Sequence, residues 1–545
     1  MKGIQNLAIL CALLFTSGLP ALGADVYITQ NTSGSNSGLD CADAHSAVWF
    51  NANARGGNTY HLCGIFTGTA GSTMLTPPSG SAGSVLTLLF ESGAVMTAPY
   101  WGGQYAGAIT INSVSYVTID GGANGLIQNT ANGTLLASQQ SSQGIAIGAS
   151  SHIEVRNLTI QNIYANNGSN PSNNDTGGQT TSDIYLWGSQ NNILIHDNIL
   201  NNARSGIRYD FDGATADTIQ FYSNTMSDHC WQIVMGGGSG GEHATNVVIH
   251  DNDMSGWMNW QCPSQSAYCN NNSVDLYHTD GVIVFEALGD SNTFAPLIYN
   301  NYIHGDLGQG SATGFIFCTY GGGSGASAPV SCKIFNNLLV QTKDPSRTTN
   351  NGPWAISMGG NGSTTTVGPH LIVNNTIVGW ASAGSNTVAI QDSSLGDTIE
   401  NNLVENFGHA METYWLPDPT VVVTGWTEDY NVWFNVAQAG SNQWAANQNN
   451  GHQYSYATWQ GAGYGYDAHG STGDPQLNSS YQISGTSSSA YQKGTNLTNL
   501  GLTALDTDKA GIARPVSGPW DAGAYQFGSG STSIAPPTSL SVTVF

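Results

Sequence analysis

Acidic, histidine and arginine side chains gather before one set of short apolar segments, although charged residues make up only 8% of the 545-residue chain. The densest group is YHTDG, in which His278 and Asp280 stand two residues apart ahead of the apolar run GVIVF. A carboxyl group and an imidazole within hydrogen-bond reach can exchange a proton during catalysis. We therefore predict Asp280 as the catalytic carboxylate and His278 as its proton partner. Asp-Gly is also an ordinary turn dipeptide, and that interpretation has equal weight.

Other ionisable residues occupy the same place in neighbouring repeats. Aligning the residues before each apolar segment places Arg204 and His229 on the repeats below Asp280, and His304 and Asp306 on the repeat above it. Equivalent points of adjacent coils lie ~4.8 Å apart, so these side chains would converge on one ledge. We predict Arg204 and His229 as catalytic, and His304 and Asp306 as substrate-binding. An alignment error of one residue would turn His229 inward and remove it from this group.

An insertion ahead of Asp280 is rich in aromatic residues and reads GWMNWQCPSQSAYCNNNSVDLYHTDG. Aromatic faces beside polar side chains are suited to sugar rings, whose apolar faces stack while their hydroxyls form hydrogen bonds. The alternative is a loop that folds its own aromatics into a small separate core. The predicted substrate-binding aromatics are Trp257, Trp260, Tyr268 and Tyr277.

A second ionisable group is IRYDFDG, with Arg208, Asp210 and Asp212 at alternating positions. Alternation along a strand places all three on one outward face. They could form a site for Ca²⁺, which prefers oxygen ligands, or a clamp for a substrate carboxylate. A surface Arg–Asp pair of little energetic value is the interpretation we favour. The sequence contains no zinc-type His/Cys spacing, no phosphate-binding glycine loop and no G-x-S-x-G.

The elements that must position these residues repeat along the chain. One asparagine recurs in a short apolar segment, at gaps of 26, 28, 49, 36, 38 and 27 residues, and each repeat adds a second apolar strand such as IYLW or GVIVF. Periods of this length are typical of solenoids, in which stacked asparagines can bond one another. We predict an all-β chain, a right-handed parallel β-helix with two strands per repeat. The predicted ladder consists of Asn157 as first rung, then Asn198, Asn224, Asn252, Asn301, Asn337, Asn375 and Asn402.

The remainder of the chain divides by composition. Residues 1–24 have a basic start, an apolar run and a small-residue end, as in a secretory signal. We expect an N-terminal cap and first coil in 25–110, regular coils in 111–440, C-terminal coils and a cap in 441–527, and a Ser/Pro-rich tail in 528–545. No later segment is apolar enough to span a bilayer. The protein is thus expected to be secreted, extracellular or at the cell surface.

The cysteines indicate the redox environment of the protein, and its charge limits the kinds of partner that it can bind. The predicted disulfides join cysteines that are close in sequence, and Cys230 is left as a buried thiol. With 11 Lys and Arg against 35 Asp and Glu, the net charge of −24 excludes a basic nucleic-acid surface. The predicted pairs are Cys41 with Cys63, Cys262 with Cys269, and Cys318 with Cys332.

The CADAHS…HLCG start, the paired strands, the asparagine ladder and the ending D-x-x-x-x-x-RP…WDAGAY together resemble a known family. They are similar to secreted bacterial right-handed parallel β-helix proteins of the pectin-lyase-like superfamily, over nearly all of the chain after residue 24. The resemblance implies the fold but not the chemistry, because that superfamily includes lyases, hydrolases, epimerases and proteins without known catalysis. The residues that form this C-terminal motif are Asp508, Arg514, Pro515, Trp520, Asp521 and Tyr525.

The family's catalytic signatures match only in part. HTDG is similar to the N-T-D-G of polygalacturonase-type glycoside hydrolases, whose aspartate is catalytic, which would make Asp280 the matching residue. The paired D-D, the G-H-G and the R-I-K of those enzymes are absent here, as are the pectate-lyase R-x-P-x-x-R and the mannuronan-epimerase D-P-H-D. The reaction class therefore stays open between a lyase and a hydrolase.

From these residues we expect a secreted polysaccharide-active enzyme, lyase or glycoside hydrolase, with its glycan along the wall of the β-helix. With so few Lys and Arg, a polyanionic glycan would need bound Ca²⁺ to supply positive charge. The alternative is a non-catalytic carbohydrate-binding, adhesive or surface-structural protein. A polysaccharide is the expected partner, with no nucleic acid, no membrane span and a monomeric state.

Overall fold

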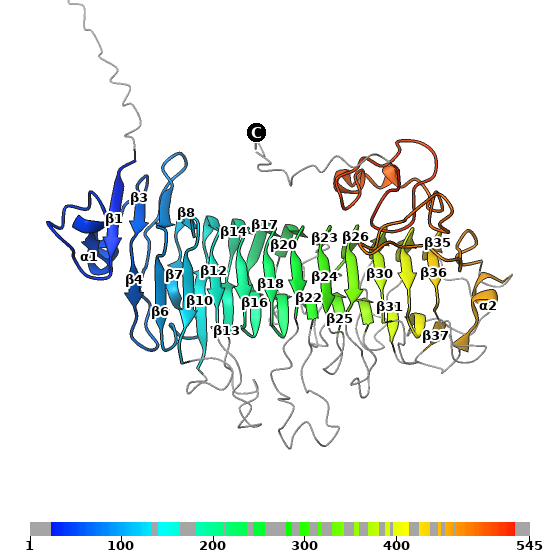
Figure 1. Ribbon diagram of the computed structural model, residues 1–545, viewed down its shortest axis with the longest axis horizontal. Helices are drawn as coiled ribbons and strands as arrows, with labels where there is room; N and C mark the ends of the chain where they lie inside the picture. Colours follow the sequence, from blue (N-terminus) through cyan, green and yellow to red (C-terminus); the bar gives the residue numbers. More distant parts are fainter. Residues whose placement is uncertain are drawn as a thin grey trace, which may run out of the picture.

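The computed structural model shows an elongated molecule, in which strands lie side by side along the long axis (Figure 1). Its described parts are residues 23–131, 140–163, 181–210, 213–236, 243–256, 280–285, 295–305, 314–318, 330–342, 354–358, 369–380, 387–392, 396–413, 425–436, 445–447, 453–461 and 465–528.

Three long sheets form the wall, with 14, 12 and 12 strands among these residues. Sheet 1 contains β2 (His45–Ser46), β1 (Asp25–Thr29), β3 (Thr59–Leu62), β5 (Leu86–Phe90), β8 (Ser115–Asp120), β11 (Ser151–Arg156), β14 (Gln190–His196), β17 (Thr215–Tyr222), β20 (His243–His250), β23 (Leu297–Tyr299), β26 (Lys333–Phe335), β29 (Leu371–Val373), β32 (Thr398–Glu400) and β35 (Thr427–Asp429). Sheet 2 contains β4 (Ile65–Thr67), β6 (Val95–Ala98), β9 (Leu126–Asn129), β12 (Thr159–Gln161), β15 (Ile199–Asn201), β18 (Thr225–Ser227), β21 (Asp253–Ser255), β24 (Tyr302–Gly305), β27 (Leu338–Gln341), β30 (Thr376–Val378), β33 (Leu403–Glu405) and β36 (Val432–Phe434). Sheet 3 contains β7 (Gly107–Asn112), β10 (Ser142–Gly148), β13 (Thr181–Trp187), β16 (Ser205–Asp210), β19 (Trp231–Gly236), β22 (Asp280–Phe285), β25 (Gly314–Cys318), β28 (Trp354–Met358), β31 (Val388–Asp392), β34 (His409–Thr413), β37 (Ala445–Asn447) and β38 (Gln453–Tyr454).

Each coil passes through sheet 1, sheet 2 and sheet 3 in turn, as β14, β15 and β16 do before β17 begins the next coil. The pairing within the sheets is parallel, apart from the antiparallel pair of β37 and β38. The chain is therefore a right-handed parallel β-helix, as predicted. The prediction of two strands per repeat was wrong, because the ladder asparagine bends its apolar segment into a strand of sheet 1 and a strand of sheet 2.

The asparagine ladder is continuous at the corner between sheets 1 and 2. The Nδ2 of Asn198 donates to the Oδ1 of Asn224 at 3.0 Å, and the same bond recurs on each coil up to Asn402 and Asn431, where it measures 3.1 Å. Asn157 is not the first rung: it lies in the left-handed region at φ 56°, and its side chain bonds Asp120. The backbone N–H of the following Leu158 takes the rung position and donates to Asn198.

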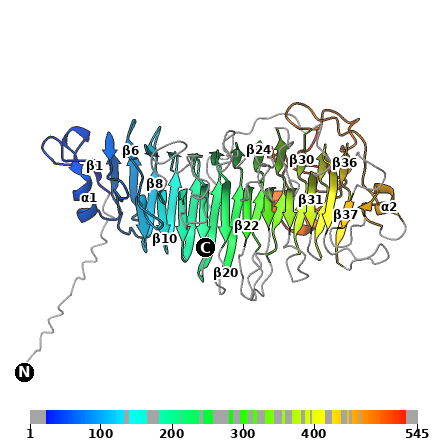
Figure 2. The same cartoon turned by 90° about the horizontal axis from the view of Figure 1, so that it is seen from below.

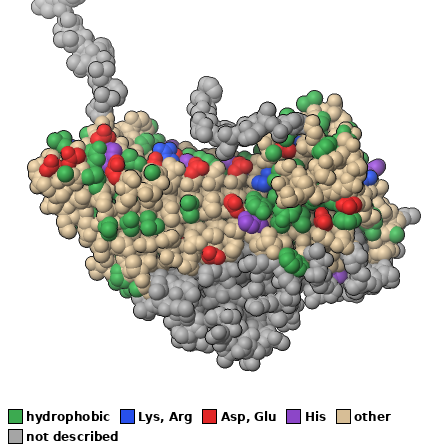
Figure 3. Space-filling view, in the orientation of Figure 1, with side chains coloured by type: hydrophobic (Ala, Val, Ile, Leu, Met, Phe, Trp, Pro, Cys, Tyr) green, Lys and Arg blue, Asp and Glu red, His purple; other side chains and the backbone are tan. Residues whose placement is uncertain are grey.

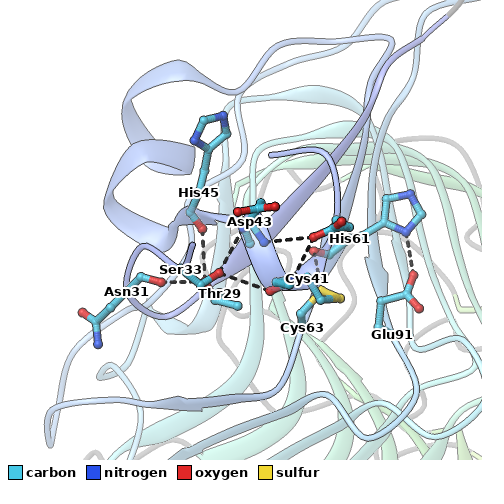
Figure 4. Close-up of a disulfide and its surroundings, with 12 residues drawn as sticks. Thr29, Asn31, Ser33, Cys41, Asp43, His45, His61, Cys63 and Glu91 are labelled. Carbon is cyan, nitrogen blue, oxygen red and sulfur yellow. Dashed lines mark hydrogen bonds and ion pairs between the residues drawn. A yellow bond between two sulfur atoms is a disulfide. The ribbon is translucent and has the colours of Figure 1, made fainter. Parts of the chain in front are cut away.

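The N-terminal end of the wall is closed by helix α1 (Ala47–Asn53), which follows η1 (Cys41–Asp43). The side chain of Ser46 accepts from the N–H of Trp49 and thereby caps the helix. The predicted Cys41–Cys63 disulfide ties this cap to β3 (Figure 4). Residues 25–110 hold more of the stack than the single coil expected, since β1, β3 and β5 already belong to sheet 1.

The other end is closed by helix α2 (Tyr456–Gln460) and by buried carboxylates. Asp467 ends the ladder, because its Oδ1 accepts from the N–H of Asn431 at 3.0 Å, where the next asparagine would otherwise stand. Its Oδ2 accepts from the indole of Trp433 and the hydroxyl of Tyr456. Burial raises the pKa of Asp467 to about 6 and that of the neighbouring Glu428 well above its ordinary value.

Residues 465–528, named here the C-terminal segment, lie against sheets 1 and 2 near that end of the wall (Figure 1). Instead of further coils, the segment has only η4 (Thr498–Leu500) and η5 (Thr503–Leu505) as named elements. The side chain of Asn374 donates to the carbonyls of Asp521 and Gly523. Trp520 packs with Phe335 and Val373 on the outside of sheet 1. The segment therefore covers wall residues that would otherwise expose apolar side chains.

The predicted Cys318–Cys332 disulfide is also present, and Cys230 is a buried free thiol. Cys262 and Cys269 lie outside the described residues. Within the described ranges, no helix has the length and apolar character needed to cross a membrane.

Candidate functional site

The outer face of sheet 3 carries the densest mixture of aromatic and ionisable side chains. Figure 2 shows this sheet from below. Its inward residues, such as Ile184 and Ile207, belong to the central core, whereas Val234, Ile283 and Phe317 form a separate apolar cluster on the opposite face. We name the outward residues the sheet 3 strip: Tyr185, Trp187, Arg208, Asp210, Trp231, Val234, Asp280, Ile283, Phe317, Trp354, Ser357, Val388, Gln391 and Glu412.

The centre of the strip contains Trp231, Asp280 and Gly314, which are register partners on β19, β22 and β25. The guanidinium of Arg204 lies 4.2 Å from the centroid of the Trp231 ring, where the ring's electrons attract a cation. The Oδ1 of Asp280 accepts from the N–H of Gly314 at 3.0 Å. Strand pairing thus brings an arginine, an indole and a carboxyl group to adjacent coils.

Asp280 is fully buried, and this burial raises the pKa of its carboxyl well above the ordinary value. A carboxyl that stays protonated near neutral pH can donate a proton to a leaving oxygen, as in lysozyme, where a carboxyl is held against a tryptophan. Its bond to Gly314 also has a structural use, since it satisfies a backbone N–H at the corner before β25. The arrangement therefore supports a proton donor or a structural corner residue.

The N-terminal end of the strip holds Tyr185, Trp187, Arg208 and Asp210. Asp210 accepts from the Nε of Arg208 and from the hydroxyl of Tyr185, each at 2.8 Å and on different oxygens. This is the Arg–Asp pair that we favoured from the sequence. Both oxygens of Asp210 accept from these donors, and Asp212, the other predicted metal ligand, lies outside the described residues.

The far end of the strip holds a carboxylate bonded by an indole. The Oε2 of Glu412 accepts from Trp354 Nε1 at 2.6 Å and from Gln391 Nε2 at 3.0 Å. Burial raises the pKa of Glu412, and the two donors oppose the shift. Aromatic and hydrogen-bonding groups therefore extend over nearly the whole length of sheet 3, but most of them are buried. The partly exposed members of the strip are Trp187, Arg208, Asp210 and Trp231.

His229 does not face this strip, so the inward alternative is the one observed. It is buried, with Nε2 2.8 Å from the Oδ2 of Asp183 and Nδ1 2.6 Å from Gln232. The preceding Asp228 is left-handed, at φ 60°, and this turns the chain inward. Ser205 pairs with Trp231, so the carbonyl of Arg204 accepts from the N–H groups of Cys230 and Trp231 and not from the Asp228–His229 pair.

His304 lies on sheet 2, on another side of the wall from Asp280. Its Nε2 is 2.8 Å from Asp253, and its ring stacks on Tyr302 at 4.0 Å. His304 therefore does not share the strip with Arg204. The other predicted site residues, namely His278, Trp257, Trp260, Tyr268, Tyr277 and Asp306, lie outside the described residues.

His196 and His250 occupy equivalent positions beside the ladder, at the ends of β14 and β20. Their rings stack on either side of Tyr222 at 4.5 and 5.0 Å. Among the described residues, no group of three His, Cys, Asp or Glu side chains could hold a metal ion. Charged side chains are sparse on the face seen in Figure 3, in keeping with their low share of the sequence.

Sequence reasoning missed the aromatic and acidic members of the strip: Tyr185, Trp187, Trp231, Trp354 and Glu412. Four of the five lie in or at the ends of strands that the sequence did identify, IYLW, WQIVM and WAISM. Alternation within IYLW places Tyr185 and Trp187 on one face. It does not predict the outward residues of the later strands, because Trp231 and Val234 are three positions apart.

Comparisons with known proteins do not add a function. No protein-family model matches the chain. No curated protein matches it either. Among solved structures, the chain is similar to the pectate lyase Pel9A, at 13% identity and a TM-score of 0.40, over 93% of this chain and 97% of that one. It is also similar to XylC, solved in complex with xylose, at 9% identity and a TM-score of 0.45, over 92% and 98%.

A rhamnogalacturonan lyase gives 13% identity and a TM-score of 0.34, over 70% of this chain and 82% of that one. Such identities and TM-scores carry no argument about chemistry. The site must therefore be judged from the side chains of this chain.

Proposed function

We propose that the protein is a secreted polysaccharide-active enzyme, a lyase or a glycoside hydrolase, with its glycan along the sheet 3 strip. The observation that carries the proposal is the strip itself, where the indoles of Trp187, Trp231 and Trp354 share one face with an arginine–carboxylate pair and with further carboxyl groups. A chain of sugars needs such a repeated surface, with apolar faces for the rings and hydrogen-bonding groups for the hydroxyls.

Asp280 is the proposed proton donor, because burial raises the pKa of its carboxyl well above the ordinary value and so favours the protonated form. Arg204, which lies over Trp231, is the proposed group that stabilises developing negative charge. In a lyase, that charge develops when the proton next to a uronate carboxylate is removed. In a hydrolase, Asp280 protonates the glycosidic oxygen.

A hydrolase also needs a second carboxylate about 5–9.5 Å from the first. Asp210 is two strands and five residues away from the position of Asp280, or roughly 19 Å from steps of ~4.8 Å between strands and ~3.3 Å along them. Glu412 is four strands and three residues away, or roughly 22 Å. Neither Asp210 nor Glu412 can be this partner, so Asp306 is the proposed second carboxylate, and His278 stays the proposed proton partner of Asp280.

The secreted location is supported by two disulfides between cysteines close in sequence, Cys41–Cys63 and Cys318–Cys332, because such bonds persist in oxidising compartments. The proposal includes a monomer, which light scattering of the purified protein would test. A Ca²⁺ requirement is tested below by adding or chelating the ion.

A non-catalytic carbohydrate-binding or adhesive function is the second candidate. It is favoured by the complete burial of Asp280 and by its bond to the Gly314 N–H, which together describe a structural corner residue. A binding protein needs the aromatic surface of the strip but no accessible acid.

The deciding experiment is a depolymerisation screen of pectin, polygalacturonate, alginate and neutral glycans, with Ca²⁺ or with a chelator. Unsaturated ends are followed by absorbance and new ends by reducing sugar. The test variant is Asp280→Asn, which keeps an oxygen for the Gly314 N–H, and the control is the exposed Asp25→Asn. Product lost only in Asp280→Asn supports the enzyme. Silence on every glycan, with binding to one, supports the second candidate.

A further inference from the structure

The indole of Trp187 lies directly above the backbone of the preceding coil. A Cβ atom placed on Gly148, its register partner on β10, would stand 2.2 Å from Cζ2 and 2.4 Å from Cε2 of that ring. Only a glycine leaves this space, so the ring rests on bare backbone. Trp187 is nevertheless half-buried and not fully covered, in contrast to its neighbour Tyr185, which is 1% exposed.

Two further aromatic rings bound the same spot. The ring of Tyr185 stacks with that of Trp187 at 5.5 Å and an interplanar angle of 21°. The ring of Tyr105, from the turn before β7, has its centroid 5.3 Å from that of Trp187, with an interplanar angle of 57°, so the planes of the two rings diverge. Half of the Tyr105 surface is exposed. If these rings only filled a small separate core, Tyr105 and Trp187 would be covered as Tyr185 is.

Polar groups lie beside the rings of Trp187 and Tyr105. On β16, Arg208 and Asp210 form an ion pair of 2.8 Å, with 17% and 19% of their side chains exposed. The two charges thus neutralise each other, and the exposed part of each side chain can meet the hydroxyls of a neighbouring sugar. The guanidinium also lies 5.9 Å from the Tyr185 ring centroid, which fixes it beside the aromatic residues.

We infer that Trp187, Tyr105, Arg208 and Asp210 form a sugar subsite that selects a neutral pyranose over a uronate. The apolar face of the sugar stacks on Trp187, Tyr105 bounds its edge, and the ion pair bonds its hydroxyls. A uronate in this place would lose hydration of its carboxylate, while the mutually neutralised Arg208–Asp210 pair would offer it no net attraction. The inference rests on the proposed function, since it assumes that a glycan lies along the sheet 3 strip.

The subsite lies some distance from the proposed reacting bond. Trp187 stands on β13, three strands and five residues away from the position of Asp280 on β22, or roughly 22 Å from steps of ~4.8 Å between strands and ~3.3 Å along them. Its contribution is therefore to binding and to the choice of sugar, not to the proton transfer.

The test is calorimetric titration of the full chain with cellohexaose, xylohexaose and hexagalacturonate. We compare the wild type with Trp187→Ala, with the conservative Trp187→Phe, and with Trp49→Ala as control. Trp49 is a partly exposed tryptophan in the N-terminal cap, where it stacks on His45 at 3.8 Å. Circular dichroism verifies that each variant is folded.

We expect a neutral hexasaccharide to bind more tightly than hexagalacturonate. Trp187→Ala should weaken that binding by about tenfold, Trp187→Phe should retain most of it, and Trp49→Ala should leave it unchanged. Gly148→Ala should weaken it as well, because the new methyl group displaces the indole.

Tighter binding of hexagalacturonate, equal binding by Trp187→Ala and Trp49→Ala, or no binding at all would overturn the subsite. The depolymerisation screen separates this result from the proposed function. Cleavage that is unaffected by Trp187→Ala would leave the enzyme proposal standing without the subsite. Binding lost in Trp187→Ala, with no glycan cleaved, would leave the subsite standing without the enzyme.

Discussion

Removing one rung of the asparagine ladder should strongly destabilise the wall. Asn301 is fully buried in the middle of the stack. Its Nδ2 donates to the carbonyls of Ile249 and Tyr299 and to Asn337, each at 3.0 Å. Its Oδ1 accepts from the backbone N–H of Asn252 at 3.1 Å. Asn301→Ala therefore removes both donors of an amide and leaves a buried backbone N–H without its acceptor.

The expected loss follows from these contacts. A buried donor without a partner costs about 1–3 kcal/mol, and each of two lost hydrogen bonds costs about 1 kcal/mol net. We therefore expect Asn301→Ala to lower the free energy of unfolding by about 3–5 kcal/mol. This estimate excludes the small cavity left by the amide, so it is a lower bound.

Guanidinium unfolding followed by circular dichroism at 25 °C gives the free energy, and hydrogen exchange of residues 295–305 shows whether the damage is local. Exchange is needed because solenoids can unfold in parts. The control is Asn191→Ala, an exposed asparagine with one bond of 3.4 Å to Asp217. If the free energy of unfolding of Asn301→Ala were within about 1 kcal/mol of that of the control, the reasoning would be refuted, because the ladder would then recur at regular intervals without stabilising the wall.

Three further changes have defined outcomes. Replacing Cys41 and Cys63 by serine should lower stability by about 3 kcal/mol in calorimetry, because their disulfide closes a loop of 22 residues. Asn374→Gly keeps the left-handed backbone of φ 52° but removes both bonds to the C-terminal segment, so deuterium uptake in 465–528 should rise. The raised pKa of Asp467, from 3.8 to about 6, adds stability that is complete below about pH 4 and is lost as the pH rises through 6. Asp467→Asn should remove that part of the pH dependence of the melting temperature.

A specific result would contradict each of these three predictions. An unchanged calorimetric midpoint would mean that the N-terminal cap does not limit stability. Uptake in the C-terminal segment equal to that of the wild type would show that its apolar contacts hold it without Asn374. Parallel melting curves from pH 4 to 7 for the wild type and Asp467→Asn would remove Asp467 as a titrating group.

The sequence by itself determined the fold, because one buried side chain per coil must satisfy the backbone at the same corner. The short amide side chain of asparagine offers both a donor and an acceptor at that point, and its recurrence indicated the coil length, the stacking and the rungs from Asn198 to Asn402. The first rung was misassigned because Asn157 and Leu158 differ by one residue. A left-handed backbone at Asn157 places its side chain outside, and no sequence pattern specifies that conformation.

The tertiary structure alone decided which side chains meet on the outer face. Asp280 faces Trp231 because parallel register joins residues 49 positions apart, and His229 turns inward because Asp228 is left-handed. The C-terminal segment meets sheet 1 through Asn374 and Asp521, which are 147 residues apart. The spacing of residues along the chain determines which features repeat. Strand register, the backbone conformation at the corners and the docking of distant segments depend instead on packing energies summed over many coils, and local sequence does not contain these energies.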